Sequence, residues 1–458
     1  MLNFISKILN SNSTQATAVL HKPSFRNTVS AASLKRNPGS APTLHSVTEG
    51  AQTPELRMVK LIMVTANNNN KFYEMEELGD GNFKVSYGRV GNKPAQRTYP
   101  MSQWDGKRRE KIRKGYKDTT HLFADKADTV DFAEMTDVQV RELMNNLMQY
   151  AQNSVFKNYR VSSADVTLQQ VTEAQNILDK LSAAVAMNMD ADDFNWHLTE
   201  LFAVIPRKMS HVKNHLIEVP QSPEDLSLIE TQLAEEQATL DVMRGQVEMH
   251  QKQQDNRAET PQTLTEAFGI HVESTDDPQI IAAVKKMMGD KAKHFHRAYQ
   301  VVNLATQEKF DRHLAAADNP ETELFWHGSR NENWLSILKT GLVLRPANAI
   351  INGKMFGYGL YFADKFAKSL NYTSLRGSYW AGGTQQKAYL ALYEVHTGNR
   401  LRVKSHQPWC GQLNAENLKK RGRKYNSVFA QGGADLINNE YIVYHEHQCT
   451  VRYLVEVR

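Results

Sequence analysis

Three short segments between residues 325 and 444 constrain this chain more than any other feature. Each is apolar or glycine-rich, and each carries one polar side chain of a different kind: His327, Tyr361 or Glu440. Short apolar runs bounded by turn-forming residues are typical of strands rather than of long helices. We therefore expect these segments to belong to an antiparallel, β-rich α+β domain.

The residues around these three positions extend the pattern. Residues 325–330 read FWHGSR, 357–364 read GYGLYFAD, 368–372 read KSLNY and 439–444 read NEYIVY. In this order, the strings resemble the catalytic domain of poly(ADP-ribose) polymerases, which carries a His-Tyr-Glu signature in such a setting. The resemblance implies an ADP-ribosyltransferase domain over residues 262–458 that uses NAD as its ADP-ribose donor and no metal.

The resemblance also implies roles for individual residues. His327, Tyr361 and Glu440 form the implied catalytic set, and Glu440 favours chain elongation over single transfer. The implied NAD contacts are His327, Gly328, Ser329, Asn333, Tyr361, Lys368, Ser369 and Tyr372.

These residue types suit the chemistry independently of the resemblance. Cleavage of the bond between nicotinamide and ribose passes through an oxocarbenium-like state, which a carboxylate stabilises. A glycine admits a planar amide, and tyrosine rings stack on an aromatic ligand. Taken singly, each side chain has an ordinary structural explanation, and only their joint occurrence in this order favours a site. Cys410, Cys449, His445 and His447 lack the spacing of zinc ligands.

Residues 55–130 are expected to form a small β-rich unit. Strand-like runs flank the turn signal at 79–82 (GDGN), and eight Lys or Arg against three acids lie between residues 97 and 118. The unit resembles a WGR domain, the DNA-end-sensing module of DNA-dependent members, although Tyr87 replaces the name-giving tryptophan. The DNA contacts we expect are Tyr87, Gly88, Arg89, Lys107, Arg108, Lys111 and Lys114. A solvated charged helix on an ordinary β-module is the alternative explanation.

Residues 131–258 are expected to be helical. Thr136 is a candidate helix cap, and Ser222-Pro223 followed by two acids marks another helix start. The segment resembles the helical regulatory domain that precedes the catalytic domain in DNA-dependent members. That resemblance implies that it restricts NAD in the resting state until DNA binds.

Residues 1–54 read as a basic, disordered tail, rich in Ser, Thr, Asn, Ala and Pro with no acid before Glu49. A plain tail, a basic arm for nucleic acid and an organelle presequence remain the alternatives. A chain of 458 residues suits about three folded domains. Two cysteines favour a reducing compartment, and no apolar run reaches the roughly 18 residues of a membrane span.

Taken together, the sequence predicts a poly(ADP-ribosyl)transferase activated by DNA breaks, acting in DNA repair. Its expected partners are DNA strand breaks, acceptor proteins including itself, and an accessory factor that completes the active site, with no membrane. A nuclear location is expected in a eukaryote, and the cytoplasm or nucleoid in a bacterial or viral source. The alternatives are a mono-ADP-ribosyltransferase and a catalytically idle scaffold that binds DNA ends.

Overall fold

The computed structural model describes residues 56–120, 132–159, 166–186, 190–255, 262–344, 355–422 and 424–458. The chain divides into Met1–Arg57 and Met58–Arg458, and every element below belongs to the second unit. The tail expected at residues 1–54 lies outside the described residues. No helix within the described ranges is long and apolar enough to cross a membrane.

The first folded region is a five-stranded antiparallel sheet in the order β4-β3-β2-β1-β5. Its strands are β1 (Met58–Thr65), β2 (Asn69–Glu77), β3 (Asn82–Arg89), β4 (Ala95–Pro100) and β5 (Lys117–Asp118). The predicted turn joins β2 to β3, and Gly81 within it has a φ of 83°, which favours glycine. Helix α2 (Trp104–Arg113) buries Trp104 edge-on against Phe83, with ring centroids 5.0 Å apart. Residues 58–118 thus form a β-rich sheet with one basic helix.

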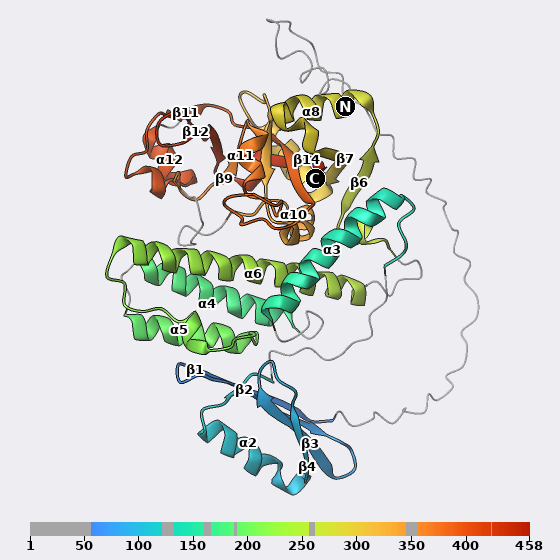
Figure 1. Ribbon diagram of the computed structural model, residues 1–458, viewed down its shortest axis with the longest axis vertical. Helices are drawn as coiled ribbons and strands as arrows, with labels where there is room; N and C mark the ends of the chain where they lie inside the picture. Colours follow the sequence, from blue (N-terminus) through green and yellow to red (C-terminus); the bar gives the residue numbers. More distant parts are fainter. Residues whose placement is uncertain are drawn as a thin grey trace, which may run out of the picture. The chain divides into compact units, whose positions relative to one another are not determined.

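Four long helices follow: α3 (Val138–Asn158), α4 (Leu168–Ala186), α5 (Ala191–Val204) and α6 (Pro223–Asp255), of which α4 packs against both α5 and α6 (Figure 1). Helix α6 begins at the predicted proline, where the Ser222 hydroxyl accepts from the Asp225 amide at 3.2 Å. The expected cap at Thr136 is wrong by one residue. The Asp137 carboxylate caps α3 instead, because it accepts from the amides of Gln139 and Val140.

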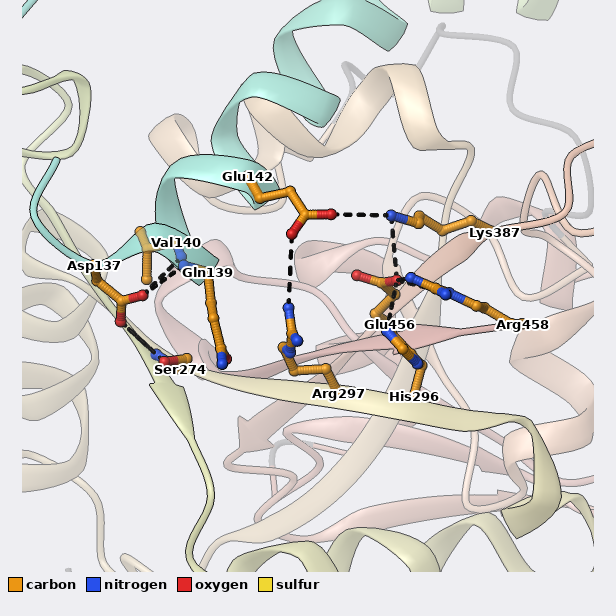
Figure 2. A network of polar contacts seen from close by, with 10 residues as sticks. All are labelled: Asp137, Gln139, Val140, Glu142, Ser274, His296, Arg297, Lys387, Glu456 and Arg458. Carbon is orange, nitrogen blue, oxygen red and sulfur yellow. Dashed lines mark hydrogen bonds and ion pairs between the residues drawn. The ribbon is translucent and has the colours of Figure 1, made fainter. Parts of the chain in front are cut away.

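Helix α3 belongs to two apolar cores. Its first half contributes Val140, Leu143 and Leu147 to the core of the C-terminal sheets, whereas Ala151 and Val155 pack among the helices. Polar contacts reinforce the first half, as Figure 2 shows. The Ser274 hydroxyl donates to Asp137 at 2.9 Å, and Glu142 lies 4.0 Å from both Arg297 and Lys387.

The C-terminal region contains two sheets, ordered β6-β7-β14-β10-β8 and β11-β12-β13-β9. The first comprises β6 (Ile270–Thr275), β7 (Phe295–Asn303), β8 (Glu323–Gly328), β10 (Ala388–Val395) and β14 (Cys449–Val457). The second comprises β9 (Leu360–Phe362), β11 (Arg400–Val403), β12 (Ser427–Ala430) and β13 (Glu440–Val443). The expected antiparallel pairing holds throughout except between β11 and β12, which run parallel.

Short helices connect these strands, in agreement with the expected scarcity of long ones. They are α7 (Leu264–Ala267), α8 (Pro278–Met288), α9 (Leu304–Ala315), α10 (Trp334–Thr340), α11 (Phe366–Leu370) and α12 (Ala415–Arg421). The two sheets meet at one β-bridge between Trp326 and Ala363. That bridge sets the geometry of the candidate site.

Candidate active site

Strand pairing brings the three signature segments side by side. The amide of Trp326 donates to the Ala363 carbonyl at 2.8 Å, and the Ala363 amide donates back at 3.0 Å. His327 on β8 thereby lies next to β9, which carries Tyr361. Tyr361 in turn pairs with Ile442 on β13, the strand that begins at Glu440. Residues more than a hundred positions apart in the sequence therefore converge at the junction of two sheets.

A cavity of about 650 Å³ opens at this junction. Every predicted catalytic and NAD-contacting residue lines it: His327, Gly328, Ser329, Asn333, Tyr361, Lys368, Ser369, Tyr372 and Glu440. Its volume lies in the range of small-molecule and cofactor sites. The structure thus gathers in one place the set of residues that the sequence motifs singled out.

The imidazole of His327 is held in one tautomer. Its Nδ1 lies 3.0 Å from the carbonyl oxygen of Tyr361, and a carbonyl only accepts, so Nδ1 carries the hydrogen. Burial lowers the pKa of His327, although the bond to Tyr361 partly opposes the effect. The ring is therefore neutral near pH 7, with Nε2 as an acceptor suited to a ribose hydroxyl.

The Glu440 carboxylate has two oxygens in different situations. One, Oε1, pairs with the ammonium of Lys368, whose pKa burial lowers while Glu440 partly restores it. The other, Oε2, is buried and has no hydrogen-bond partner among the described residues. An unsatisfied buried carboxylate oxygen is costly. A hydroxyl donor from a bound ligand would satisfy it.

Glycine is required at position 328 by a close approach of backbone. A Cβ at Gly328 would lie 1.9 Å from the carbonyl oxygen of Ser369 on α11. The backbones of β8 and α11 are therefore in close contact, and both residues line the cavity, where peptide groups suit a planar carboxamide. Nearby, the Asn333 amide donates to the Ser329 hydroxyl at 3.0 Å and fixes both side chains at the cavity wall.

Two tyrosines also line the cavity. The Tyr361 hydroxyl donates to the Gly357 carbonyl at 2.8 Å and accepts from the Phe356 amide at 3.1 Å. Its phenol is thereby fixed, and burial raises its pKa. Burial, with a contribution from Glu440, also raises the pKa of Tyr372. Both rings are neutral at physiological pH and offer apolar faces to a ligand.

Residues from the helical region form part of the same cavity, which sequence reasoning missed. They are Gln175 and Asp179 on α4 and Asp241, Val242 and Arg244 on α6. Gln175 donates to Asp179 at 2.9 Å and exchanges hydrogen bonds with Gln237, which donates to Asp241 at 3.0 Å. The signal was present in the sequence, because these polar residues recur at a helical spacing of three or four.

The seven predicted DNA contacts lie on or beside the first sheet, and several have partners within the protein. Arg89 donates to both oxygens of Asn68 and to the Ser210 carbonyl, so its guanidinium faces the helical region. Arg108 pairs with Asp118 and Lys114 with Glu110. The remaining four are Tyr87 and Gly88 on β3 and Lys107 and Lys111 on α2.

The two lysines on α2 lie over aromatic rings. Lys107 is 4.6 Å from the centre of the Tyr99 ring, and Lys111 is 4.3 Å from that of Tyr73. Tyr87 pairs with Tyr73 across the sheet, with ring centroids 6.0 Å apart.

Neither cysteine contributes to the cavity. Cys410 and Cys449 are buried free thiols, and burial raises the pKa of each. Within the described ranges, no group of three or more His, Cys, Asp or Glu residues is placed to hold a metal ion.

Comparison with known proteins points to the same family as the sequence motifs. Residues 275–458 match the family model described as "Poly(ADP-ribose) polymerase catalytic domain". A "Putative poly [ADP-ribose] polymerase-like 100L" from Invertebrate iridescent virus 6 is 32% identical over 167 residues, which are 35% of this chain and 84% of the viral protein. "Poly [ADP-ribose] polymerase 2" from Zea mays is 24% identical over 466 aligned residues, covering 85% of this chain and 68% of the plant protein. The Homo sapiens protein of that name is 33% identical over 158 residues, or 30% of this chain and 26% of its own length.

Proposed function

The chain belongs to the poly(ADP-ribose) polymerase family and is an NAD-dependent ADP-ribosyltransferase, and we propose that it elongates ADP-ribose chains on protein acceptors, itself included, when broken DNA binds to it. The observation that carries the elongation proposal is the buried, unsatisfied Oε2 atom of Glu440, a residue that lines the cavity together with His327 and Tyr361.

NAD fits this cavity group by group. The cavity wall at Gly328 and Ser369 suits the nicotinamide carboxamide, and the rings of Tyr361 and Tyr372 suit the aromatic ring of nicotinamide. The acceptor Nε2 of His327 suits a hydroxyl of the adenosine ribose. Oε2 of Glu440 suits the 2′-hydroxyl of the nicotinamide ribose, which would supply the missing donor.

Glu440 then has two functions in transfer. The bond between nicotinamide and C1′ breaks toward a cationic, oxocarbenium-like state, and a nearby carboxylate stabilises that charge. Nicotinamide leaves as a neutral molecule, so its departure requires no general acid. The same carboxylate orients the hydroxyl of the incoming acceptor, with Lys368 holding the other oxygen in place.

Regulation by DNA is the second part of the proposal. The first sheet and α2 are the proposed DNA-end module, and Lys107, Lys111 and Tyr87 are its proposed contacts. Helices α4 and α6 supply carboxylates to the cavity wall through Asp179 and Asp241. With the single cation of Arg244 beside these two carboxylates, the wall keeps a net negative charge, which opposes the pyrophosphate of NAD in the resting state. Binding of DNA is proposed to favour a second state in which this wall moves away.

The experiment is automodification with labelled NAD, with and without nicked or broken duplex DNA, resolved by product length. The proposal expects long labelled chains that depend on broken DNA. A single unit per acceptor would make the protein a mono-ADP-ribosyltransferase, and no incorporation at all would leave a DNA-binding scaffold. Equal labelling with and without DNA would remove the regulatory part alone.

A further inference from the structure

A second basic segment, apart from the proposed DNA-binding module, lies in the C-terminal region. Residues 400–424 contain eight Lys or Arg and a single acid, Glu416. This local excess of positive charge is larger than the one at residues 97–118, where three acids accompany eight cations. The segment contains β11, α12 and the loop between them, which lie together in Figure 1.

The basic segment packs directly on residues 356–358, which lead into β9 and Tyr361. Its residues Cys410, Leu413 and Leu418 share an apolar core with Phe356, and Tyr361 packs against that core. The Tyr358 amide donates to the Leu413 carbonyl at 2.7 Å. A Cβ at Gly357 would lie 2.0 Å from that same carbonyl oxygen, so the two backbones are in close contact. The basic segment therefore borders the active site.

Most cations of the described part of the segment are exposed and lack acidic partners, whereas Arg400 pairs with Glu323. Six are exposed in the described part of the segment: Arg402, Lys404, Lys419, Lys420, Arg421 and Lys424. Among the described residues, none of the six forms an ion pair, in contrast to the Arg108–Asp118 and Lys114–Glu110 pairs of the first basic region.

Aromatic rings accompany these cations. The Arg421 guanidinium lies 4.1 Å from the centre of the Trp409 ring, and that of Arg402 lies 5.5 Å from the centre of Phe429. Unpaired cations interleaved with aromatic rings are characteristic of surfaces that bind flexible single-stranded polyanions, through phosphate neutralisation and stacking. A compact anion such as free phosphate would not need such a spread of cations.

We propose that this basic segment binds the ADP-ribose chain while the enzyme extends it. The inference rests on the proposed elongation activity. Each unit of that chain carries a doubly charged pyrophosphate and an adenine ring, which match the exposed cations and the Trp409 ring. The segment borders Tyr361, beside which the end of the chain must reside during each transfer, so a chain held here remains near the site between additions.

The test uses the full chain and ADP-ribose chains prepared with another enzyme. Lys419→Gln/Lys420→Gln/Arg421→Gln should bind these chains at least tenfold more weakly than wild type at about 0.1 M salt. The slope of log affinity against log salt should fall by about 2, because each phosphate contact on a single strand contributes about 0.7. Its initial rate of nicotinamide release should be unchanged, whereas its own products should be shorter.

Two further variants control for charge and folding. Lys293→Gln/Lys309→Gln/Arg312→Gln removes three exposed cations from a different part of the same region and should behave as wild type. Lys419→Arg/Lys420→Arg/Arg421→Lys keeps the charge and should retain affinity for the chains. Thermal melts of all three variants separate loss of binding from loss of folding.

Three results would overturn or limit the proposal. Unchanged affinity for the chains, or weaker binding with product length unaltered, overturns the proposal. Loss of affinity for single-stranded DNA alone also overturns it and makes the segment a nucleic-acid surface. If wild type adds only single units, elongation fails as a function, yet affinity for prepared chains still decides whether the segment binds them.

Discussion

At the scale of single residues, the two carboxylate oxygens of Glu440 lie in different surroundings. One of its oxygens is tied to Lys368, and the other is buried without a partner among the described residues. This asymmetry fits a carboxylate that is fixed on one side and binds a ligand hydroxyl on the other.

Replacing Glu440 with Gln removes the charge while keeping the shape. We expect transfer to the chain end to fall about 10²- to 10³-fold, the usual effect of losing one stabilising group at a developing charge, with KM for NAD changed by less than about threefold. Initial rates of nicotinamide release together with product length provide the measurement. Glu321→Gln, on an exposed residue, is the matched control. Chains of wild-type length from the Glu440 variant would remove it from this role.

Gly328 gives a prediction based on space alone. An alanine there would place its Cβ 1.9 Å from the carbonyl oxygen of Ser369, so α11 must shift and the cavity wall proposed for the carboxamide is displaced. We expect activity to fall more than about 100-fold and stability by about 1–3 kcal/mol, the usual cost of overpacking. Gly411→Ala, whose Cβ would meet no atom within 4 Å, should have neither effect. Denaturant unfolding and NAD turnover test both parts, and a fully active Gly328→Ala enzyme would contradict the packing.

At the scale of elements, the candidate site forms where the two C-terminal sheets meet. The apolar runs predicted the strands, and the order of motifs predicted which side chains meet. The bridge from Trp326 to Ala363 could not be predicted, because it joins two short strands through a single pair of residues. The parallel pairing of β11 with β12 was also missed, since alternation within a strand does not specify the direction of its neighbour.

Polar contacts between distant segments were the least predictable feature. Thr136 and Asp137 can both cap a helix, but aspartate is the better N-cap, and the contact of Asp137 with Ser274 on β6 adds to this preference. Arg89 belongs to a motif associated with DNA binding, yet its guanidinium contacts Asn68 and Ser210. Such choices depend on tertiary partners that a local sequence pattern does not contain.

A cluster of histidines at α9 predicts how stability depends on pH. His396 donates from Nε2 to the Asn319 carbonyl at 2.8 Å, so its Nδ1 accepts from His313 Nε2 at 2.7 Å. The His447 ring lies 4.8 Å from that of His313. Burial, together with the charges that His396, His447 and His445 acquire, lowers the pKa of His313 to about 4.

Because the pKa of His313 is depressed on folding, the unfolded chain binds the proton more readily. Its contribution to stability is therefore lost as the pH falls from about 6.5 towards 4. We expect a loss of about 1 kcal/mol between pH 7 and pH 5 after allowing for solvent screening of a half-exposed ring. His313→Gln should flatten the dependence of the unfolding free energy on pH, whereas exposed His271→Gln should not. Identical pH profiles for wild type and His313→Gln would rule out this cause.

At the scale of the whole molecule, the helical region and the catalytic sheets share structure. Helix α3 contributes Val140, Leu143 and Leu147 to the catalytic core, and α6 contributes Asp241 and Arg244 to the cavity wall. A change in the helical region therefore has a direct physical route to the site. The predicted boundaries at 55–130, 131–258 and 262–458 remain a prediction, because residues 58–458 form a single unit.

Removing residues 131–255 should give NAD turnover without DNA, because the wall formed by α4 and α6 is lost. The truncated protein should also be less stable, since the apolar surface that α3 covers becomes exposed. A single substitution tests the same contact without exposing the surface under α3. Glu248→Gln breaks the ion pair between Glu248 on α6 and Lys339 on α10. It should raise DNA-independent turnover severalfold. A folded, NAD-binding truncation that stays silent without DNA would refute the regulatory proposal.

The central claim is that one cavity at the junction of two sheets binds NAD for cleavage at C1′. A crystal structure with an NAD analogue whose glycosidic bond cannot break, obtained with a broken duplex bound, tests it most directly. In that structure we expect the carboxamide beside Gly328 and the nicotinamide ring between Tyr361 and Tyr372. The 2′-hydroxyl should lie within hydrogen-bond distance of Glu440 Oε2. An analogue bound elsewhere, or bound here with Glu440 out of reach of the ribose, would contradict it.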